Sequence, residues 1–148
     1  MSPKPAFLLD INIVMDYLQQ RQPWYPLARI LFQAEAQEQV DLFIAANTVA
    51  TIHYLIRQKD SPQKALAKIG MLLRRLRIAD VTGAVVEEAL RLGLDDLEDG
   101  IQAAAAVAAG IRVLVTRNVA DFGRVRRRIE SLQVLSPEVA AAALRAAT

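Results

Sequence analysis

The chain of 148 residues contains no cysteine, which excludes disulfide bonds, thiolate zinc sites and cysteine nucleophiles. This absence is compatible with a reducing compartment, and we expect a cytoplasmic protein. Histidine is also scarce, and His53 is the only one in the chain. It lies beside Tyr54 within a predicted helix, where we interpret it as a packing residue. The sequence therefore does not support catalysis by a Ser-His-Asp triad.

Long apolar runs are also missing from the sequence. The longest nearly uncharged stretch, residues 100–111, is too short to cross a bilayer, and the N-terminal residues lack the apolar core of a signal peptide. We therefore expect no membrane association. Apolar residues still make up 53% of the chain, enough to build the core of one domain spanning residues 1–148.

Short apolar segments alternate with amphipathic segments along the chain. Strands are predicted at residues 6–9, 40–45, 76–81, 111–115 and 134–135. Helical periodicity fills the intervals between them. This alternation predicts an α/β protein with a parallel sheet covered by helices on both faces.

Several helix ends can be read from capping residues. Ser61 and Ser136 each precede a proline, which is favoured at the first helical position. Thr82 is predicted to cap a helix that ends at Gly93. Asn47 or Thr48 is predicted to cap the helix after residues 40–45. An alanine-rich helix is expected to begin at Asp95 or Asp96 and to end at Gly110.

Isolated acidic residues fall at informative places in this pattern. Asp10 and Asp121 each follow a predicted strand, and Asp96, Glu98 and Asp99 open the alanine-rich helix. Carboxylates beyond the C-terminal ends of parallel strands can converge in one crevice. Hard divalent cations prefer such clustered oxygens. The pattern therefore points to metal-dependent chemistry on a phosphate backbone.

Each acidic segment also has a simpler interpretation. Asp10 and Asn12 can serve as a helix N-cap pair, and acids in a first helical turn gain roughly 0.3–1 kcal/mol each from the helix dipole. Residues 116–118 can form an ordinary polar turn. The stretch 95–99, however, holds more carboxylates than capping requires. Their mutual repulsion would be relieved by a bound cation.

Three segments resemble motifs of the PIN domain family. The stretch Leu-Leu-Asp-Ile-Asn-Ile-Val at residues 8–14 is similar to its opening motif. Residues 96–105 resemble its central acidic helix start, and residues 114–122 resemble its last acidic segment. The three matches occur in the family's order and spacing over nearly the whole chain.

The resemblance implies a three-layer α/β/α sandwich with a central parallel sheet of four to five strands. It also implies a metal-dependent endoribonuclease, often the VapC-like toxin of a type II toxin–antitoxin pair. Carried over by position, the metal ligands for Mg²⁺ or Mn²⁺ are Asp10, Asp99 and Asp121, with Asp96 as an accessory acid and Thr116 and Asn118 as orienting residues. From its place two residues after Asp10, Asn12 is a further candidate to orient that carboxylate. The expected partners are an RNA substrate, a cognate antitoxin and a second copy in a homodimer.

The sequence departs from the family pattern at one position. The family usually has a second acid near the start of the helix after its second strand, and Thr51 takes that place here. A hydroxyl is uncharged, so metal affinity and activity should be lower. A catalytically degenerate PIN-like binding module therefore stays open as the alternative.

Basic and aromatic residues suggest how RNA is held. The net charge of +2 is weak evidence for a nucleic-acid partner, but arginines cluster after the last acidic segment. The predicted RNA-backbone contacts are Arg117, Arg124, Arg126 and Arg127, and a solvated helix face is the alternative. Trp24 and Tyr25 flank prolines, and a turn packed on the core is favoured there over base stacking or a partner contact. The helix at 27–34 or this turn is a candidate dimer interface.

Overall fold

A five-stranded parallel sheet lies at the centre of the structure, a computed structural model that describes residues 3–147. In spatial order the strands are β3-β2-β1-β4-β5, and every neighbouring pair is parallel. Their bounds are β1 (Ala6–Leu9), β2 (Asp41–Ala45), β3 (Arg77–Ala79), β4 (Val113–Val115) and β5 (Gln133–Leu135). The predicted strands are confirmed, although β3 and β4 are shorter than the apolar segments that contain them.

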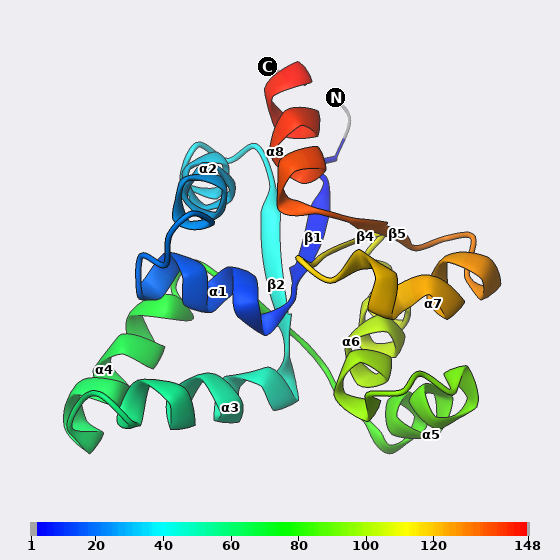
Figure 1. Ribbon diagram of the computed structural model, residues 1–148, viewed down its shortest axis with the longest axis horizontal. Helices are drawn as coiled ribbons and strands as arrows, with labels where there is room; N and C mark the ends of the chain where they lie inside the picture. The colour runs from blue at the N-terminus through cyan, green and yellow to red at the C-terminus, as the bar shows by residue number, and fades with distance from the viewer. Residues whose placement is uncertain (1–2, 148) are drawn as a thin grey trace.

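Helices cover both faces of the sheet, as the sequence predicted (Figure 1). The first face carries α1 (Ile11–Leu18), α2 (Tyr25–Ala36), α3 (Ala46–Arg57), α4 (Pro62–Leu72) and α8 (Pro137–Ala146). The second carries α5 (Gly83–Leu92), α6 (Leu97–Ala108), the 3-10 helix η1 (Val119–Phe122) and α7 (Gly123–Arg128). The three-layer α/β/α architecture is therefore confirmed. None of the helices between residues 3 and 147 has the length and apolar character to cross a membrane.

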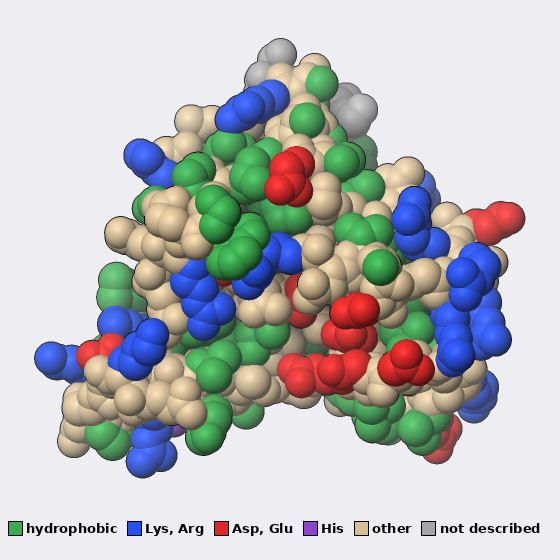
Figure 2. All heavy atoms as spheres, in the orientation of Figure 1, with side chains coloured by type: hydrophobic (Ala, Val, Ile, Leu, Met, Phe, Trp, Pro, Cys, Tyr) green, Lys and Arg blue, Asp and Glu red, His purple; other side chains and the backbone are tan. Residues whose placement is uncertain are grey.

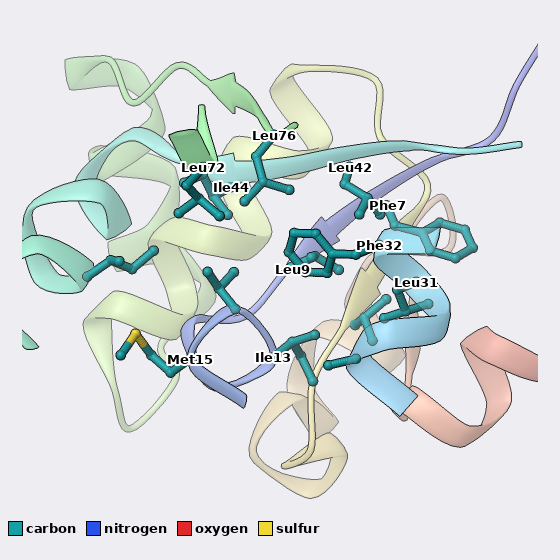
Figure 3. Close-up of a cluster of buried hydrophobic side chains, with 14 of the residues drawn as sticks. Phe7, Leu9, Ile13, Met15, Leu31, Phe32, Leu42, Ile44, Leu72 and Leu76 are labelled. Atoms are coloured by element: carbon teal, nitrogen blue, oxygen red, sulfur yellow. The ribbon is translucent and has the colours of Figure 1, made fainter. Parts of the chain in front are cut away.

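Alternating side chains divide the sheet between two cores. Phe7 and Leu9 of β1 point into the first core, and Leu8 points into the second. Figure 3 shows side chains of β1, α1 and α2 gathered in the first core. The apolar side of the predicted helix at 27–34 is buried there, because Ala28, Leu31, Phe32 and Ala34 are all buried. These core residues are therefore not available as a dimer interface.

The second core depends on small residues in α6. Residues 103–106 are four buried alanines, so α6 lies close against the sheet. Gly100 faces α5, where an added Cβ would lie 3.2 Å from the carbonyl oxygen of Ala89. The beginning of α6 is therefore held tightly between α5 and the sheet.

Most predicted helix ends are confirmed. The side chains of Ser61, Thr82 and Ser136 cap α4, α5 and α8, and Gly93 ends α5 with a φ of 64°. The predicted cap of α3 is wrong, because that helix begins directly after β2 with Ala45 as its N-cap residue. Asn47 and Thr48 thus lie inside its first turn.

The topology identifies one edge of the sheet as the place for a site. From β1 the chain builds outward through β2 to β3, then crosses to the other side of β1 for β4 and β5. The order reverses between β1 and β4, and ligands of open α/β sheets bind beyond the C-terminal ends of strands at such a switch point. Because α6 leads into the start of β4, its own start lies at that same C-terminal edge. Asp10, the start of α6 and the segment after β4 therefore meet there.

Candidate active site

Asp10 is a buried carboxylate, only 5% exposed, at the end of β1. One oxygen, Oδ1, accepts hydrogen bonds from the backbone N of Ile11 at 2.7 Å and from Nε2 of Gln102 at 3.2 Å. The other, Oδ2, accepts from the hydroxyl of Thr116 at 2.7 Å. Asp10 therefore caps α1 and is fixed in orientation by α6 and by the segment after β4 at the same time.

Asp99 lies half-buried in the first turn of α6 and is the most perturbed acid of the site. Burial raises its pKa to about 7, and the negative charges of Asp10, Asp96, Asp121 and Glu98 contribute to this increase. Coulomb repulsion of this kind requires the carboxylates to be near one another. The acids that raise the pKa of Asp99 thus come from three separate segments of the chain. Figure 2 shows acidic side chains gathered near the middle of this face.

Glu98 extends the acidic cluster next to Asp99. Burial raises its pKa, and the charges of Asp96 and Asp10 raise it further. Asp96 is the N-cap residue of α6 and accepts a hydrogen bond from the backbone N of Glu98 at 2.8 Å. The Asp96 carboxylate therefore serves the helix end and contributes charge to the cluster.

Some oxygen atoms of the site lack a hydrogen-bond partner and are of the kind that hard cations prefer. Oε1 of Glu98 and Oε1 of Gln102 are buried acceptor oxygens without a hydrogen-bond partner. Such oxygens could ligate a divalent cation, whose charge would offset the repulsion that raises the pKa of Asp99. Over residues 3–147, however, no three His, Asp or Glu side chains stand in a ligating arrangement. Carboxylates that share one cation would therefore move toward one another on binding.

No carboxylate of α3 contributes to the site. Thr51 lies half-buried on α3, and none of the acids that raise the pKa of Asp99 comes from this helix. Asn47 and Thr48, in the first turn of α3, instead present buried oxygens, Oδ1 and Oγ1, that have no hydrogen-bond partner. The side of the site formed by the end of β2 is therefore polar but uncharged.

The three predicted orienting residues occupy different positions. Thr116 is fully buried, and besides binding Asp10 its hydroxyl accepts a hydrogen bond from the backbone N of Asn118 at 3.1 Å. The Asn118 side chain itself is exposed. Asn12 is half-buried on α1, and within the described residues its side chain donates no hydrogen bond to Asp10. Thr116, and not Asn12, is therefore the predicted residue in direct contact with the Asp10 carboxylate.

The sequence analysis did not identify Gln102 as part of the site. It is 1% exposed and lies one helical turn after Asp99, on the same face of α6. The only signal in the sequence is a single long polar side chain in an otherwise alanine-rich helix. That signal does not reveal the contact, because 92 positions separate Gln102 from Asp10.

The arginines of α7 divide into two pairs. Arg124 donates to the carbonyl oxygen of Gly93, and Arg128 donates to that of Leu92 at 3.1 Å, so both satisfy the C-terminal end of α5. Arg126 and Arg127 are exposed on the same helix. Lys and Arg side chains lie beside the acidic centre over α7 in Figure 2.

A polar groove connects the basic helix with the acidic cluster. Its lining residues are Leu94, Asp95, Ala120, Asp121, Gly123, Arg124 and Arg127. Asp121 thus belongs both to the groove and to the acids around Asp99. Arg117, the remaining predicted RNA contact, is instead engaged within the protein by Asp16 and Trp24.

These features define an α/β/α protein whose acidic site lies at the switch point of a parallel sheet. The sequence agrees with this class, because residues 6–120 match the PIN domain. The chain belongs to the PIN domain family.

Solved structures with this fold come from several bacteria. VapBC-1 from nontypeable Haemophilus influenzae aligns with a TM-score of 0.67 and 20% identity over 90% of this chain and 98% of that chain. A toxin–antitoxin complex from Klebsiella pneumoniae aligns with a TM-score of 0.63 and 24% identity over 88% of this chain and 96% of that chain. VapC20 from Mycobacterium tuberculosis is described as a toxin that cleaves the sarcin-ricin loop. It aligns with a TM-score of 0.58 and 14% identity over 73% of this chain and 86% of that chain. A comparison with curated protein sequences finds no match.

Proposed function

We propose that this protein is a metal-dependent endoribonuclease of the PIN type and the toxin of a type II toxin–antitoxin pair. The observation that carries the proposal is the arrangement at the switch point. The Asp10 carboxylate is fixed by hydrogen bonds from three segments, beside an Asp99 whose pKa is raised by burial and by neighbouring acids. Such a concentration of unneutralised carboxylates is typical of a site that binds a divalent cation.

In this proposal Asp10, Asp99 and Asp121 hold Mg²⁺ or Mn²⁺, and Asp96 adds negative charge from the start of α6. A cation held there would supply Lewis-acid chemistry, activating a water and stabilising charge on the scissile phosphate. Thr116 and Gln102 keep the Asp10 carboxylate oriented through their hydrogen bonds to its two oxygens. Asp99, whose pKa is raised to about 7 in the metal-free protein, would have to be deprotonated to ligate the cation.

The groove beside Asp121 is the proposed path of the RNA backbone. Arg127 lines this groove, Arg126 is exposed on the same helix, and both would supply positive charge to the phosphates. Arg124 lines the same groove while it also binds the carbonyl oxygen of Gly93. Its contact with α5 fixes the position of the guanidinium, so less side-chain entropy is lost when a phosphate binds.

The proposed protein partner is an antitoxin. The Klebsiella pneumoniae relative is described as a toxin–antitoxin complex, and this fold similarity supports a partner of the same kind for this chain. We also propose that the protein forms a homodimer and acts in the cytoplasm.

The direct test is cleavage of single-stranded RNA in the presence and absence of Mn²⁺ or Mg²⁺. We expect the wild-type protein to cleave only with metal and Asp10→Asn to be inactive. Asp80→Asn is the matched control, because Asp80 is exposed and is not among the acids that raise the pKa of Asp99. Equal cleavage by wild type and Asp10→Asn would contradict the assigned site.

The alternative function is that of a PIN-like binding module without catalysis. The absence of a carboxylate at Thr51 favours it, because the site then has one negative charge fewer than is usual in the family. If wild type and Asp10→Asn are both inactive at saturating metal, while the folded protein still binds RNA or a protein partner, the alternative is correct.

A further inference from the structure

Trp24 is the only tryptophan of the chain, and it stays partly exposed in the turn before α2. Its side chain is 36% exposed, whereas most large apolar side chains nearby are buried in the first core. The guanidinium carbon of Arg117 lies 3.8 Å from the centre of the ring and therefore covers one of its faces. Trp24 is thus held in place without being enclosed.

Arg117 is in turn fixed by a buried carboxylate. Its Nε lies 3.1 Å from Oδ2 of Asp16, and its Nη2 donates to Oδ1 at 3.3 Å. Asp16 is 1% exposed, and Arg21 also acts on its charge. Two arginines therefore face one aspartate, so this corner of the molecule carries net positive charge next to the indole.

The backbone below Trp24 is equally well anchored. Its carbonyl oxygen accepts hydrogen bonds from the backbone N of Leu27 at 3.1 Å and of Ala28 at 3.2 Å. The ring of the next residue, Tyr25, lies 6.3 Å from that of Tyr17, which stacks on Phe32 at 3.8 Å. A rigid support of this kind lowers the entropy lost when a ligand binds the exposed ring.

The Trp24–Arg117 pair adjoins the acidic site through the segment after β4. Arg117 directly follows Thr116, whose hydroxyl is hydrogen-bonded to the Asp10 carboxylate at 2.7 Å. Thr116 and Arg117 thus connect the Asp10 carboxylate and the indole ring through two adjacent residues.

We propose that Trp24, backed by Arg117, is a stacking platform for one unpaired base of the RNA substrate. This inference rests on the proposed ribonuclease function and names how that site binds its substrate. An aromatic ring gives sequence-tolerant stacking to any base, and the positive charge of the two arginines suits the attached phosphates. Because Arg117 is occupied by Asp16, it acts as a positioning residue for the indole and not as a phosphate ligand.

The fluorescence of Trp24 provides a direct test, because no other tryptophan contributes to the signal. Metal-free protein at low ionic strength is titrated with a short single-stranded RNA and with an abasic oligonucleotide of the same length. We expect saturable quenching by the RNA and little change with the abasic strand, which has phosphates but no bases. Equal quenching by both strands, or no quenching by RNA, would overturn the proposal.

Variants then separate the ring from the fold. We expect Trp24→Ala to weaken binding of a labelled RNA roughly ten-fold, and Trp24→Phe to retain most of it. Tyr54→Ala is the control, since Tyr54 is also an exposed aromatic, 62% exposed, but lies on α3. Equal losses in Trp24→Ala and Tyr54→Ala would contradict a specific platform. A fluorescence change with protein concentration alone would instead assign the ring to contacts between copies.

The two proposals can fail separately. Quenching is measured without metal and does not depend on cleavage. Quenching by RNA in a protein that never cleaves RNA would therefore contradict only the ribonuclease proposal. A protein that cleaves RNA with unchanged KM after Trp24→Ala disproves only the platform.

Discussion

At the scale of single residues, Asp99 is the acid of the metal-free site whose pKa is raised most by burial and neighbouring charges. Its pKa of about 7 means that ionisation is disfavoured in the folded protein by burial and by four neighbouring acids. An unfolded chain ionises the same carboxyl near the model value of 3.8. Folding stability therefore falls as the pH rises between these two values, and the penalty is complete above pH 7.

Asp99→Asn is accordingly expected to stabilise the metal-free protein at pH 8 and to have little effect at pH 4. We expect a melting temperature higher by roughly 2–4 °C for each kcal/mol recovered at pH 8. Thermal unfolding in the presence of a chelator measures this, with Asp80→Asn as the control. A melting temperature at pH 8 that does not exceed that of wild type would contradict a crowded acidic site.

Gln102 illustrates a site residue whose role lies in holding another. Its Nε2 donates to Asp10, and the residue is almost completely buried. Gln102→Met keeps the length of the side chain but removes the donor. We expect Mn²⁺ affinity to fall roughly ten-fold, as for other residues that orient a metal ligand. Titration calorimetry measures this, and Gln33→Met, at an exposed position of α2, should bind Mn²⁺ like wild type.

At the scale of elements, the Asp16–Arg117 ion pair connects α1 with the segment after β4. Asp16 is buried, and burial raises its pKa while Arg117 and Arg21 lower it. Removal of Arg117 leaves a buried carboxylate with less compensation, which is a strongly destabilising change.

We expect Arg117→Ala to lower the free energy of unfolding by about 3 kcal/mol at pH 8. The loss should shrink at lower pH, because Asp16 then folds in its neutral form. Denaturant unfolding at several pH values measures this dependence. The double variant Asp16→Asn/Arg117→Ala should be less destabilised than Arg117→Ala at pH 8. A pH-independent loss would contradict the ion pair as its cause.

The sequence predicted elements well where the signal is local. β1 was predicted at its observed bounds, and Ser61, Thr82 and Ser136 cap helices as expected, because capping needs only neighbouring residues. At α7 the sequence indicated a solvated helix face only as an alternative, without bounds for a helix. The helical form of α7 depends on burial of Val125 in the second core, which a run of arginines does not indicate.

The same division applies to the candidate site. Position at strand ends and a helix start marked Asp10, Asp121 and the acids of residues 95–99 as candidates, and the resemblance to the PIN family selected Asp10, Asp99 and Asp121 among them. The contacts of Gln102 with Asp10 and of Arg117 with Asp16 could not be predicted. They join residues 92 and 101 positions apart and arise only from tertiary packing.

At the scale of the whole molecule, charge is separated on one face. Acidic residues occupy the centre of that face and basic residues lie beside them over α7 (Figure 2). In the proposed function, the arginines of α7 attract the RNA strand, and a bound cation would offset the negative charge of the acidic centre.

This separation predicts a salt dependence of RNA binding. Each phosphate contact to a single strand contributes about 0.7 to the slope of log affinity against log salt concentration. Arg126→Gln/Arg127→Gln should therefore make the slope less steep by up to about 1.4. Fluorescence anisotropy of a labelled RNA with metal present measures the slope. Arg29→Gln, at an exposed position of α2, is the control and should leave the slope unchanged.

The central claim is that carboxylates from three distant segments share one divalent cation. The most direct measurement is anomalous scattering from a crystal soaked in Mn²⁺. We predict one manganese peak bounded by the carboxylates of Asp10, Asp99 and Asp121, and its disappearance in Asp10→Asn crystals. A wild-type crystal without a peak among these residues, or with manganese bound only elsewhere, would contradict the account.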